Sequence, residues 1–320
     1  MTTIRAAGVR IGWHDLPVAV HGRVEDVLGD RVVAAESQRG GFSPGTADRV
    51  RTATGGRAFV KAVSTALNVT SAEMARREAH VTRQMPGDAP VPRLLGYFDD
   101  GEWVVLVLED IAGRHPRTPW VEDETDAAAT ALRDLAGTLT PSRISGVPQA
   151  ADVLADHFAG WAALADDPME DLDPWAAVRL GELHAAAMRG LTVLRTGETV
   201  AHGDIRADNL LVRPDGAITV VDWPWACLAP EWLDTLLLAM NITVYGGPGD
   251  LLLTGVDHAQ ATDVLAGFTG YFMHRSRLPS PGIPHVREFQ RAQADALLPW
   301  LAARQVGPPA HPGGPGNPGH

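Results

Sequence analysis

Apolar positions recur with two different periods in the first 108 residues, which predicts a β-rich segment that also contains two helices. Helical spacing indicates a short amphipathic helix within residues 14–28 and a second helix over 71–85. Ser71 would cap the second helix, and Pro86 and Gly87 would end it. Four runs with strict alternation or continuous apolar character are predicted strands: 31–37, 47–53, 57–63 and 103–108.

Helical periodicity dominates the chain from residue 114 onward and predicts an α-rich region. The predicted helices are 123–138, 153–165, 174–194, 235–242, 259–275 and 286–304. The chain then ends in GPPAHPGGPGNPGH, which has too many prolines and glycines to form a core. We therefore predict a tail over 306–320.

Composition limits the class of protein. A length of 320 residues suggests two domains, and 45% hydrophobic with 21% charged residues is ordinary for a globular chain. A net charge of -12 disfavours a nucleic-acid partner and is compatible with a cationic ligand. A single cysteine, Cys227, excludes an internal disulfide, and its apolar surroundings indicate a buried thiol. No signal sequence or membrane span is apparent, so we expect a cytoplasmic protein.

The strongest chemical signal lies at 200–225, where carboxylates and an amide follow short apolar runs. Asp215 and Gly216 are typical of a two-residue hairpin turn, and that register would place Asn209 opposite Asp222. Opposed residues have Cβ atoms roughly 4.5 to 5.5 Å apart, so their oxygens could share one Mg²⁺ ion. Asp204 would remain free to accept a proton from an attacking hydroxyl.

Two interpretations of this stretch are open. In one, Asp204 and Asp208 are only turn and cap residues of a surface hairpin. In the other, His202-x-Asp204-x-x-x-x-Asn209 followed by Asp222-Trp resembles the catalytic loop and metal-binding aspartate of the aminoglycoside phosphotransferase and choline kinase family. The full set of residues favours this second interpretation.

The resemblance implies an α+β chain with a bilobal protein-kinase-like fold, in which a small antiparallel sheet forms one lobe and helices form the other. The implied domains are a nucleotide-binding lobe over 1–108, a hinge over 109–113, an α-rich catalytic and acceptor-binding lobe over 114–305, and the tail. Backbone groups of Glu109 and Ile111 in the hinge would hold adenine. His202 and Asp234 would support the catalytic loop.

The resemblance also assigns Lys61 to the nucleotide phosphates, paired with a helix glutamate. Glu78 is our choice for that partner because it lies within the apolar stripe of the helix predicted over 71–85. An edge-strand lysine that discourages aggregation is the alternative for Lys61. In the loop after the first strand, Gly41, Ser43 and Gly45 would approach the phosphates. Because Phe42 interrupts its glycine pattern, an ordinary hairpin is the alternative for this loop.

The sequence thus predicts an ATP-dependent phosphotransferase that uses Mg²⁺, with GTP a possible substitute for ATP. The proposed acceptor is a hydroxyl of an aminoglycoside-like antibiotic. A kinase of choline, an amino alcohol or a sugar and a catalytically silent nucleotide-binding module are the alternatives. The short segment after Asp222 favours a small-molecule acceptor over a peptide. The acidic run at 166–173 could bind a polyamine or be a solvated loop, and the oligomeric state stays open.

Overall fold

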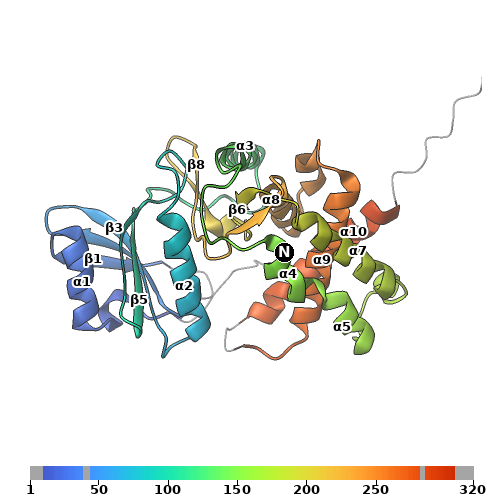
Figure 1. Ribbon diagram of the computed structural model, residues 1–320, viewed down its shortest axis with the longest axis horizontal. Helices are drawn as coiled ribbons and strands as arrows, with labels where there is room; N and C mark the ends of the chain where they lie inside the picture. Colours follow the sequence, from blue (N-terminus) through green and yellow to red (C-terminus); the bar gives the residue numbers. More distant parts are fainter. Residues whose placement is uncertain (1–9, 39–43, 282–284, 307–320) are drawn as a thin grey trace, which may run out of the picture.

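The computed structural model describes residues 10–38, 44–281 and 285–306 and arranges them in two lobes (Figure 1). The smaller lobe is a five-stranded antiparallel sheet with the strand order β1-β2-β3-β5-β4. Its strands are β1 (Val32–Ser37), β2 (Thr46–Thr52), β3 (Arg57–Ser64), β4 (Leu94–Asp99) and β5 (Trp103–Leu108). The four predicted strands are confirmed to within one residue at each end.

One helix covers each face of this sheet. The helix α1 (Val18–Leu28), which follows a 3-10 turn at Trp13–Asp15, packs on one face, and α2 (Val69–Thr82) packs on the other (Figure 1). Strand β3 sends alternate side chains to the two faces, so Val60 is buried toward α1 while Lys61 faces the α2 side. This alternation brings Lys61 within reach of α2.

The predicted start of α2 is wrong. The helix begins at Val69 and its cap is Asn68, whose side-chain oxygen accepts a hydrogen bond from the Ser71 backbone N–H at 2.8 Å. Asn and Ser are both good capping residues, so the sequence offered two candidates three positions apart. The helix ends at Thr82 rather than at residue 85. Residues 83–85 instead continue as hydrogen-bonded turns.

The larger lobe is mainly helical. Its helices are α3 (Glu122–Thr138), α4 (Ala150–Phe158), α5 (Gly160–Asp166), α6 (Pro174–Ala177), α7 (Leu180–Leu194), α8 (Leu233–Val244), α9 (His258–Ser276) and α10 (Val286–Val306), with 3-10 turns at Ala207–Asn209 and Gly249–Leu253. Two short antiparallel pairs complete it: β6 (Thr199–Ala201) with β9 (Cys227–Ala229), and β7 (Leu210–Val212) with β8 (Ile218–Val220).

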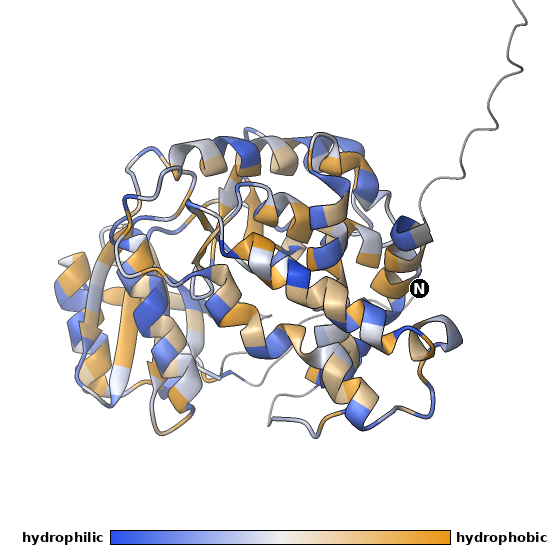
Figure 2. Cartoon of the chain, turned by 45° about the vertical axis from the view of Figure 1, so that its right-hand side comes forward, coloured by the Kyte–Doolittle hydropathy of each residue, from blue (hydrophilic) through white to orange (hydrophobic). Residues whose placement is uncertain are grey.

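Helix α9 is central to this lobe and packs against α5, α7 and α10. Figure 2 shows apolar and polar residues in alternating bands along the helices, as expected of amphipathic helices that share a core. The predicted helix over 153–165 is two helices that meet at Ala159. Here a Cβ atom on Gly160 would lie 2.3 Å from the Gly270 carbonyl oxygen, so only glycine allows α5 to approach α9 this closely.

Cys227 is buried in the core of the larger lobe, as its apolar surroundings predict. Burial raises the pKa of this thiol well above its usual range, so it stays protonated and unreactive near neutral pH. Within the described ranges, no helix combines the length and the apolar character that a membrane span requires.

Candidate active site

Two short strands lead into the loop that carries most of the candidate residues. Strand β6 ends at Ala201, and the chain then passes through His202, Asp204 and Asn209 before β7 begins. Strand β8 ends at Val220, two residues before Asp222. Since β6, β7 and β8 are apolar and buried, the polar side chains that follow them emerge at one edge of the core.

The predicted register of the β7–β8 hairpin is wrong by one residue. Leu210 pairs with Val220, and the Val221 N–H donates to the Asn209 carbonyl oxygen at 3.0 Å, so Asn209 faces Val221 rather than Asp222. The connection contains three residues because Arg213 pairs with Ala217 through a hydrogen bond of 2.8 Å. The final loop residue is Gly216, whose φ of +83° matches the left-handed position of three-residue hairpin loops.

His202 and Asp234 fix the start of the catalytic loop. The buried Asp234 carboxylate accepts the backbone N–H groups of His202 at 2.7 Å and Gly203 at 3.1 Å. The His202 ring accepts the Asp204 N–H at 3.2 Å and donates from Nε2 to the Val221 carbonyl at 2.9 Å. Gly203 has a φ of +79° and lies against the Trp225 carbonyl, which a Cβ would approach to 2.6 Å. A side chain there would therefore distort the loop.

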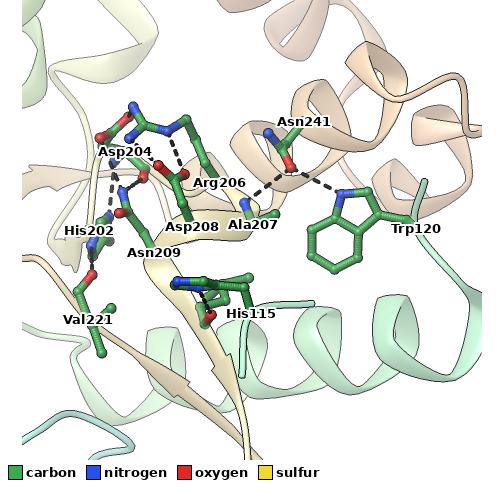
Figure 3. A network of polar contacts seen from close by, with 11 residues as sticks. His115, Trp120, His202, Asp204, Arg206, Ala207, Asp208, Asn209, Val221 and Asn241 are labelled. Atoms are coloured by element: carbon green, nitrogen blue, oxygen red, sulfur yellow. Dashed lines mark hydrogen bonds and ion pairs between the residues drawn. The ribbon is translucent and has the colours of Figure 1, made fainter. Parts of the chain in front are cut away.

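The Asp204 carboxylate is oriented from both sides within its own loop (Figure 3). Arg206 Nη1 donates to its Oδ1 at 3.0 Å, while Asn209 Nδ2 donates to its Oδ2 at 3.2 Å and to its backbone carbonyl at 2.7 Å. Burial raises the pKa of Asp204 to about 6, although the nearby Arg206 charge opposes that rise. A carboxylate with a raised pKa is a better proton acceptor.

The sequence interpretation did not single out Arg206, and it considered Asp208, the second partner of Arg206, only as a turn or cap residue. Arg206 donates from Nε and Nη2 to the two carboxylate oxygens of Asp208, at 3.0 and 3.1 Å. Burial acts to raise the pKa of Asp208, but the Arg206 guanidinium holds it below its usual value. An arginine flanked by aspartates at i−2 and i+2, as in Asp204-Ile-Arg206-Ala-Asp208, was the available signal.

A second set of contacts attaches this loop to the helices of the larger lobe (Figure 3). The Asn241 side-chain oxygen on α8 accepts the Ala207 N–H at 3.2 Å and the Trp120 indole N–H at 3.0 Å. The His115 ring makes a hydrogen bond of 3.1 Å with the Leu210 carbonyl. The loop is therefore held by hydrogen bonds to the segment before α3 as well as to α8.

The smaller lobe contributes Lys61, which bridges two carboxylates. Its Nζ lies 2.7 and 2.8 Å from the Glu78 oxygens and 2.5 Å from Asp222 Oδ1. Burial acts to lower the pKa of Lys61, but Asp222 and Glu78 raise it above its usual value. Burial raises the pKa of Glu78. The charged lysine therefore links β3, α2 and the loop of the larger lobe.

Comparisons with known proteins agree with this arrangement. The family described as "Phosphotransferase enzyme family" matches residues 40–270. The chain belongs to this family. It has the protein-kinase-like fold of its members, with an antiparallel sheet in one lobe and helices in the other. A search of curated proteins found no match.

Solved phosphotransferase structures resemble the chain over most of its length. An aminoglycoside 2′-phosphotransferase in complex with GDP has a TM-score of 0.63 and 15% identity, over 90% of this chain and 97% of that one. A choline kinase from Streptococcus pneumoniae has a TM-score of 0.58 and 14% identity, over 89% and 98%. An aminoglycoside phosphotransferase from Alicyclobacillus acidocaldarius has a TM-score of 0.54 and 16% identity, over 86% and 92%. At these identities the likeness shows the shared fold.

Asn209 and Asp222 fit the oxygen donors that Mg²⁺ prefers. Because Asn209 Nδ2 donates to Asp204, its amide oxygen is the atom left for a cation. The Asp222 side chain is 44% exposed and directs only Oδ1 to Lys61 in the described contacts. Among the residues described, no group of three or more His, Cys, Asp or Glu side chains could enclose a metal ion. Such a pair suits an ion that takes its other ligands from phosphate and water.

The residues predicted to form the hinge already have hydrogen-bond partners within the protein at some of their backbone groups. Glu109 donates its N–H to the Arg93 carbonyl at 2.9 Å, and the Ile111 carbonyl accepts from Arg49 Nη2. Arg49 also contacts Asp110 at 2.8 Å. The backbone groups that remain for adenine are the Glu109 carbonyl and the Ile111 N–H. Their contact with a nucleotide stays a prediction.

The predicted glycine loop lies only partly within the described chain. Gly41 and Ser43 fall outside the described residues. Gly45 lies against β3, where a Cβ atom would approach the Ala62 carbonyl oxygen to 2.5 Å. Close packing on β3 therefore explains Gly45, and its contact with phosphate stays a prediction.

The acidic run at 166–173 is partly paired within the protein. Asp167 forms an ion pair with Arg277, and Asp171 lies 2.5 Å from Arg291. Asp173 caps α6 by accepting the Trp175 N–H at 2.8 Å. Three of the acidic side chains thus have structural partners that hold the α5–α6 segment, and polyamine binding by this run stays a prediction.

Proposed function

We propose that the chain transfers the γ-phosphoryl group of ATP to a hydroxyl group of a small molecule. The contact between Lys61 and Asp222 supports this proposal most. Asp222 receives Lys61 from the smaller lobe at 2.5 Å, and its charge is among those that act on the pKa of Asp204. A phosphate-binding lysine and a candidate base are therefore brought together across the two lobes.

In this proposal Asp204 accepts the proton of the acceptor hydroxyl as its oxygen attacks the γ-phosphorus. A new P–O bond forms, the bond to the β–γ bridging oxygen breaks, and ADP leaves with that electron pair. Arg206 and Asn209 hold the Asp204 carboxylate for this transfer. His202 and Asp234 keep the loop backbone in place.

Lys61, positioned by Glu78, would bind the nucleotide phosphates. Asn209 and Asp222 would hold Mg²⁺, and the bound ion would offset phosphate charge. GTP could replace ATP, since one neighbouring aminoglycoside phosphotransferase structure contains GDP with kanamycin and another contains ADP with hygromycin B. The hinge backbone at Glu109 and Ile111 would bind the base, and Gly45 would belong to the loop above the phosphates.

The comparisons support a hydroxylated small molecule as the acceptor. An aminoglycoside-like antibiotic is the first class to test, because several structural neighbours are aminoglycoside phosphotransferases. A metabolite alcohol such as choline, an amino alcohol or a sugar is the second, because a choline kinase is also among the neighbours. A panel of both classes in an ADP-release assay separates them. ATP binding without turnover on any acceptor would favour the silent module.

The substitution Asp204→Asn tests the proposed base. It preserves the side-chain shape but removes the proton-accepting carboxylate, so kcat should fall on the order of 10²- to 10⁴-fold. Binding of Mg-ATP, measured by calorimetry, should stay within about twofold. The matched control is Asp215→Asn, an exposed turn residue of the same hairpin. Unchanged turnover by the Asp204→Asn protein would contradict the mechanism.

A further inference from the structure

A wall of aromatic and basic side chains from α4, α9 and α10 lies beside the catalytic loop. Tyr271 on α9 places its ring 4.3 Å from the His157 ring on α4, and His157 lies 6.4 Å from the ring of Trp225. Burial raises the pKa of Tyr271, and Asp204 is among the charges that act on it. The half-buried Tyr271 is therefore near enough to the candidate base for the two groups to interact electrostatically.

Two arginines converge on this tyrosine. The guanidinium carbon of Arg275 lies 5.7 Å from the centre of the Tyr271 ring. Arg287 donates from Nη1 to the Gln290 side chain at 2.8 Å, and Gln290 is itself hydrogen-bonded to Tyr271. Arg287 also donates from Nε and Nη2 to the Pro279 carbonyl, at 3.1 and 2.9 Å. Both arginines are thus held beside Tyr271 by contacts that leave their charge unneutralised.

No carboxylate in the described chain forms an ion pair with Arg275 or Arg287. The undescribed residues cannot supply one from a side chain, because 1–9, 39–43, 282–284 and 307–320 contain no Asp or Glu. Burial lowers the pKa of Arg287, and the Arg275 charge lowers it further. Burial and Arg275 also lower the pKa of His157 to about 4, so this histidine is neutral near pH 7.

Neighbouring arginines on the same elements behave differently. Arg277, two residues after Arg275, forms an ion pair with Asp167, and Arg291, one turn after Arg287, lies 2.5 Å from Asp171. The chain therefore pairs the arginines beside the acidic run and leaves the two beside Tyr271 unpaired. Keeping two like charges together in a partly buried place is unfavourable unless an anion joins them.

The wall is continuous with the catalytic machinery through α10. The Arg206 guanidinium carbon lies 5.7 Å from the ring centre of Phe289, which sits between Arg287 and Gln290 in the sequence. Arg206 in turn donates to Asp204 at 3.0 Å. A ligand that contacts this wall would therefore lie next to the candidate base.

We propose that Arg275 and Arg287 bind an anionic group, a carboxylate or a phosphate, on the acceptor whose hydroxyl approaches Asp204. The inference rests on the proposed phosphotransfer and specifies its acceptor. Guanidinium groups offer planar pairs of donors that match carboxylate and phosphate oxygens. The rings of Tyr271 and Trp225 would contact a flat or apolar part of the molecule. On this proposal the acceptor is a hydroxylated anion, a third class beside the aminoglycoside and metabolite-alcohol classes that the structural neighbours suggest.

Inorganic phosphate is the first probe, titrated calorimetrically into the full chain with the nucleotide site saturated by a non-hydrolysable Mg-ATP analogue. The wild type should bind phosphate, and Arg275→Gln and Arg287→Gln should each raise the Kd by about tenfold or more. Arg275→Lys and Arg287→Lys keep the positive charge and should retain part of the affinity. This result would show that the Gln variants lose binding because they lose charge and not because they misfold. The matched control Arg291→Gln should bind as the wild type does. Absence of binding to the wild type, or a wild-type Kd in both Gln variants, would overturn the proposal.

Competition against phosphate then distinguishes the source of the anion. One arm compares 4-hydroxyphenylacetate with its amide, and the other compares glycerol phosphate with glycerol. The charged member of at least one pair should displace phosphate, and the neutral members should not. Displacement by kanamycin or choline instead would contradict the proposal. Because no measurement here needs turnover, its failure is distinct from loss of the phosphotransferase function, which the Asp204→Asn assay reports.

Discussion

The short run from Asp204 to Asn209 places a candidate base, a cationic side chain and an amide in one loop. Arg206 lies between two carboxylates, with Asp204 on one side and Asp208 on the other. Its charge keeps the pKa of Asp204 from rising above about 6 despite burial. Its planar fork satisfies both Asp208 oxygens while one nitrogen reaches Asp204. A single point charge could not occupy all these positions at once.

We expect Arg206→Lys to lower kcat by about 10- to 100-fold, because the lysine ammonium cannot hold both carboxylates and Asp204 loses its orientation. Affinity for Mg-ATP should change little, since Arg206 contacts neither Lys61 nor Glu78 in the described structure. Single-turnover kinetics separate the two quantities. Arg213→Lys, in the same hairpin, is the control. Wild-type kcat in the Arg206→Lys protein would show that orientation by this side chain is unnecessary.

The sequence identified individual residues best where a charged side chain stands at a position that is otherwise apolar or that a motif specifies. Lys61 was assigned by the family resemblance and Glu78 was chosen because it interrupts the apolar stripe of its helix, and the structure joins them at 2.7 Å. The hairpin register failed because Asp215-Gly216 resembles a two-residue turn, whereas Pro214 adds a third loop residue. The role of Arg206 and Asp208 was missed because the sequence does not show whether neighbouring aspartates and an arginine form an exposed ion pair or orient a buried carboxylate.

At the scale of elements, the strands were predictable because side chains alternate between two buried faces of the sheet. Strand β4 was not predicted, because Gly96 interrupts its apolar run and most of its residues are only half-buried. The helix over 174–194 divides into α6 and α7 at Val178 and Arg179, a break that apolar spacing alone does not mark. Alternation thus identified the edge strand β1 as well as the inner strands, but it missed the glycine-interrupted β4 and the helix break.

The cap of α2 matters because this helix carries Glu78. Asn68→Ala removes the acceptor for the Ser71 N–H and should lower the free energy of unfolding by about 0.5–2 kcal/mol. Ser71→Ala is the matched control and should cost much less, because the Ser71 backbone N–H is unchanged. Urea unfolding of both variants measures the difference. Equal losses in the two proteins would mean that the side chain of Asn68 is not the effective cap.

Glu124 in the first turn of α3 holds the segment that precedes this helix in the chain. Its buried carboxylate contacts Arg114 at 2.5 Å and accepts from the Arg117 N–H and Nε at 2.7 and 2.8 Å. The Arg114 hydrogen bond is the main reason that the pKa of Glu124 falls to about 2 from its usual 4.5. A lowered carboxyl pKa stabilises the fold above pH 4.5, and this stabilisation disappears as the pH falls toward 2.

Glu124→Gln should therefore lower stability by about 1–3 kcal/mol at pH 7. The difference from the wild type should shrink as the pH falls below about 4.5, because the wild-type carboxylate then begins to lose its charge. Urea midpoints between pH 7 and 3 measure this trend. Glu122→Gln, an exposed neighbour in the same turn, is the control. A difference that stays constant over the whole range would exclude the ionic explanation.

For the whole molecule, several contacts connect the lobes. They include Lys61 with Asp222, and a hydrogen bond of 2.8 Å from the Val220 N–H to the Pro90 carbonyl. His80 and Gln84 hydrogen-bond with Ser145, and Arg49 and Arg57 of the sheet contact Asp110 in the predicted hinge. The first contact involves a candidate metal ligand, so nucleotide and metal should act together on how the lobes are joined. Ligands that bind only the folded state stabilise it by mass action.

We expect Mg-ADP to raise the melting temperature of the wild type by several degrees and ADP with EDTA to raise it clearly less. Asp222→Asn should remove most of that difference, because one metal ligand loses its charge. Asp215→Asn should behave as the wild type does. The measurement is thermal unfolding of each protein without nucleotide, with Mg-ADP, and with ADP and EDTA. Equal stabilisation with and without Mg²⁺ would argue against Asn209 and Asp222 as metal ligands.

Asp222 also has a backbone conformation that glycine adopts most easily. Its φ of +72° costs about 1 kcal/mol or more for a residue with a side chain, although Asp and Asn tolerate it better than most. Glycine at 222 would relieve this backbone cost, but it would also remove the carboxylate that pairs with Lys61. A thermostability screen of this protein therefore needs an activity filter, because a substitution that relaxes the backbone at 222 also removes a candidate metal ligand.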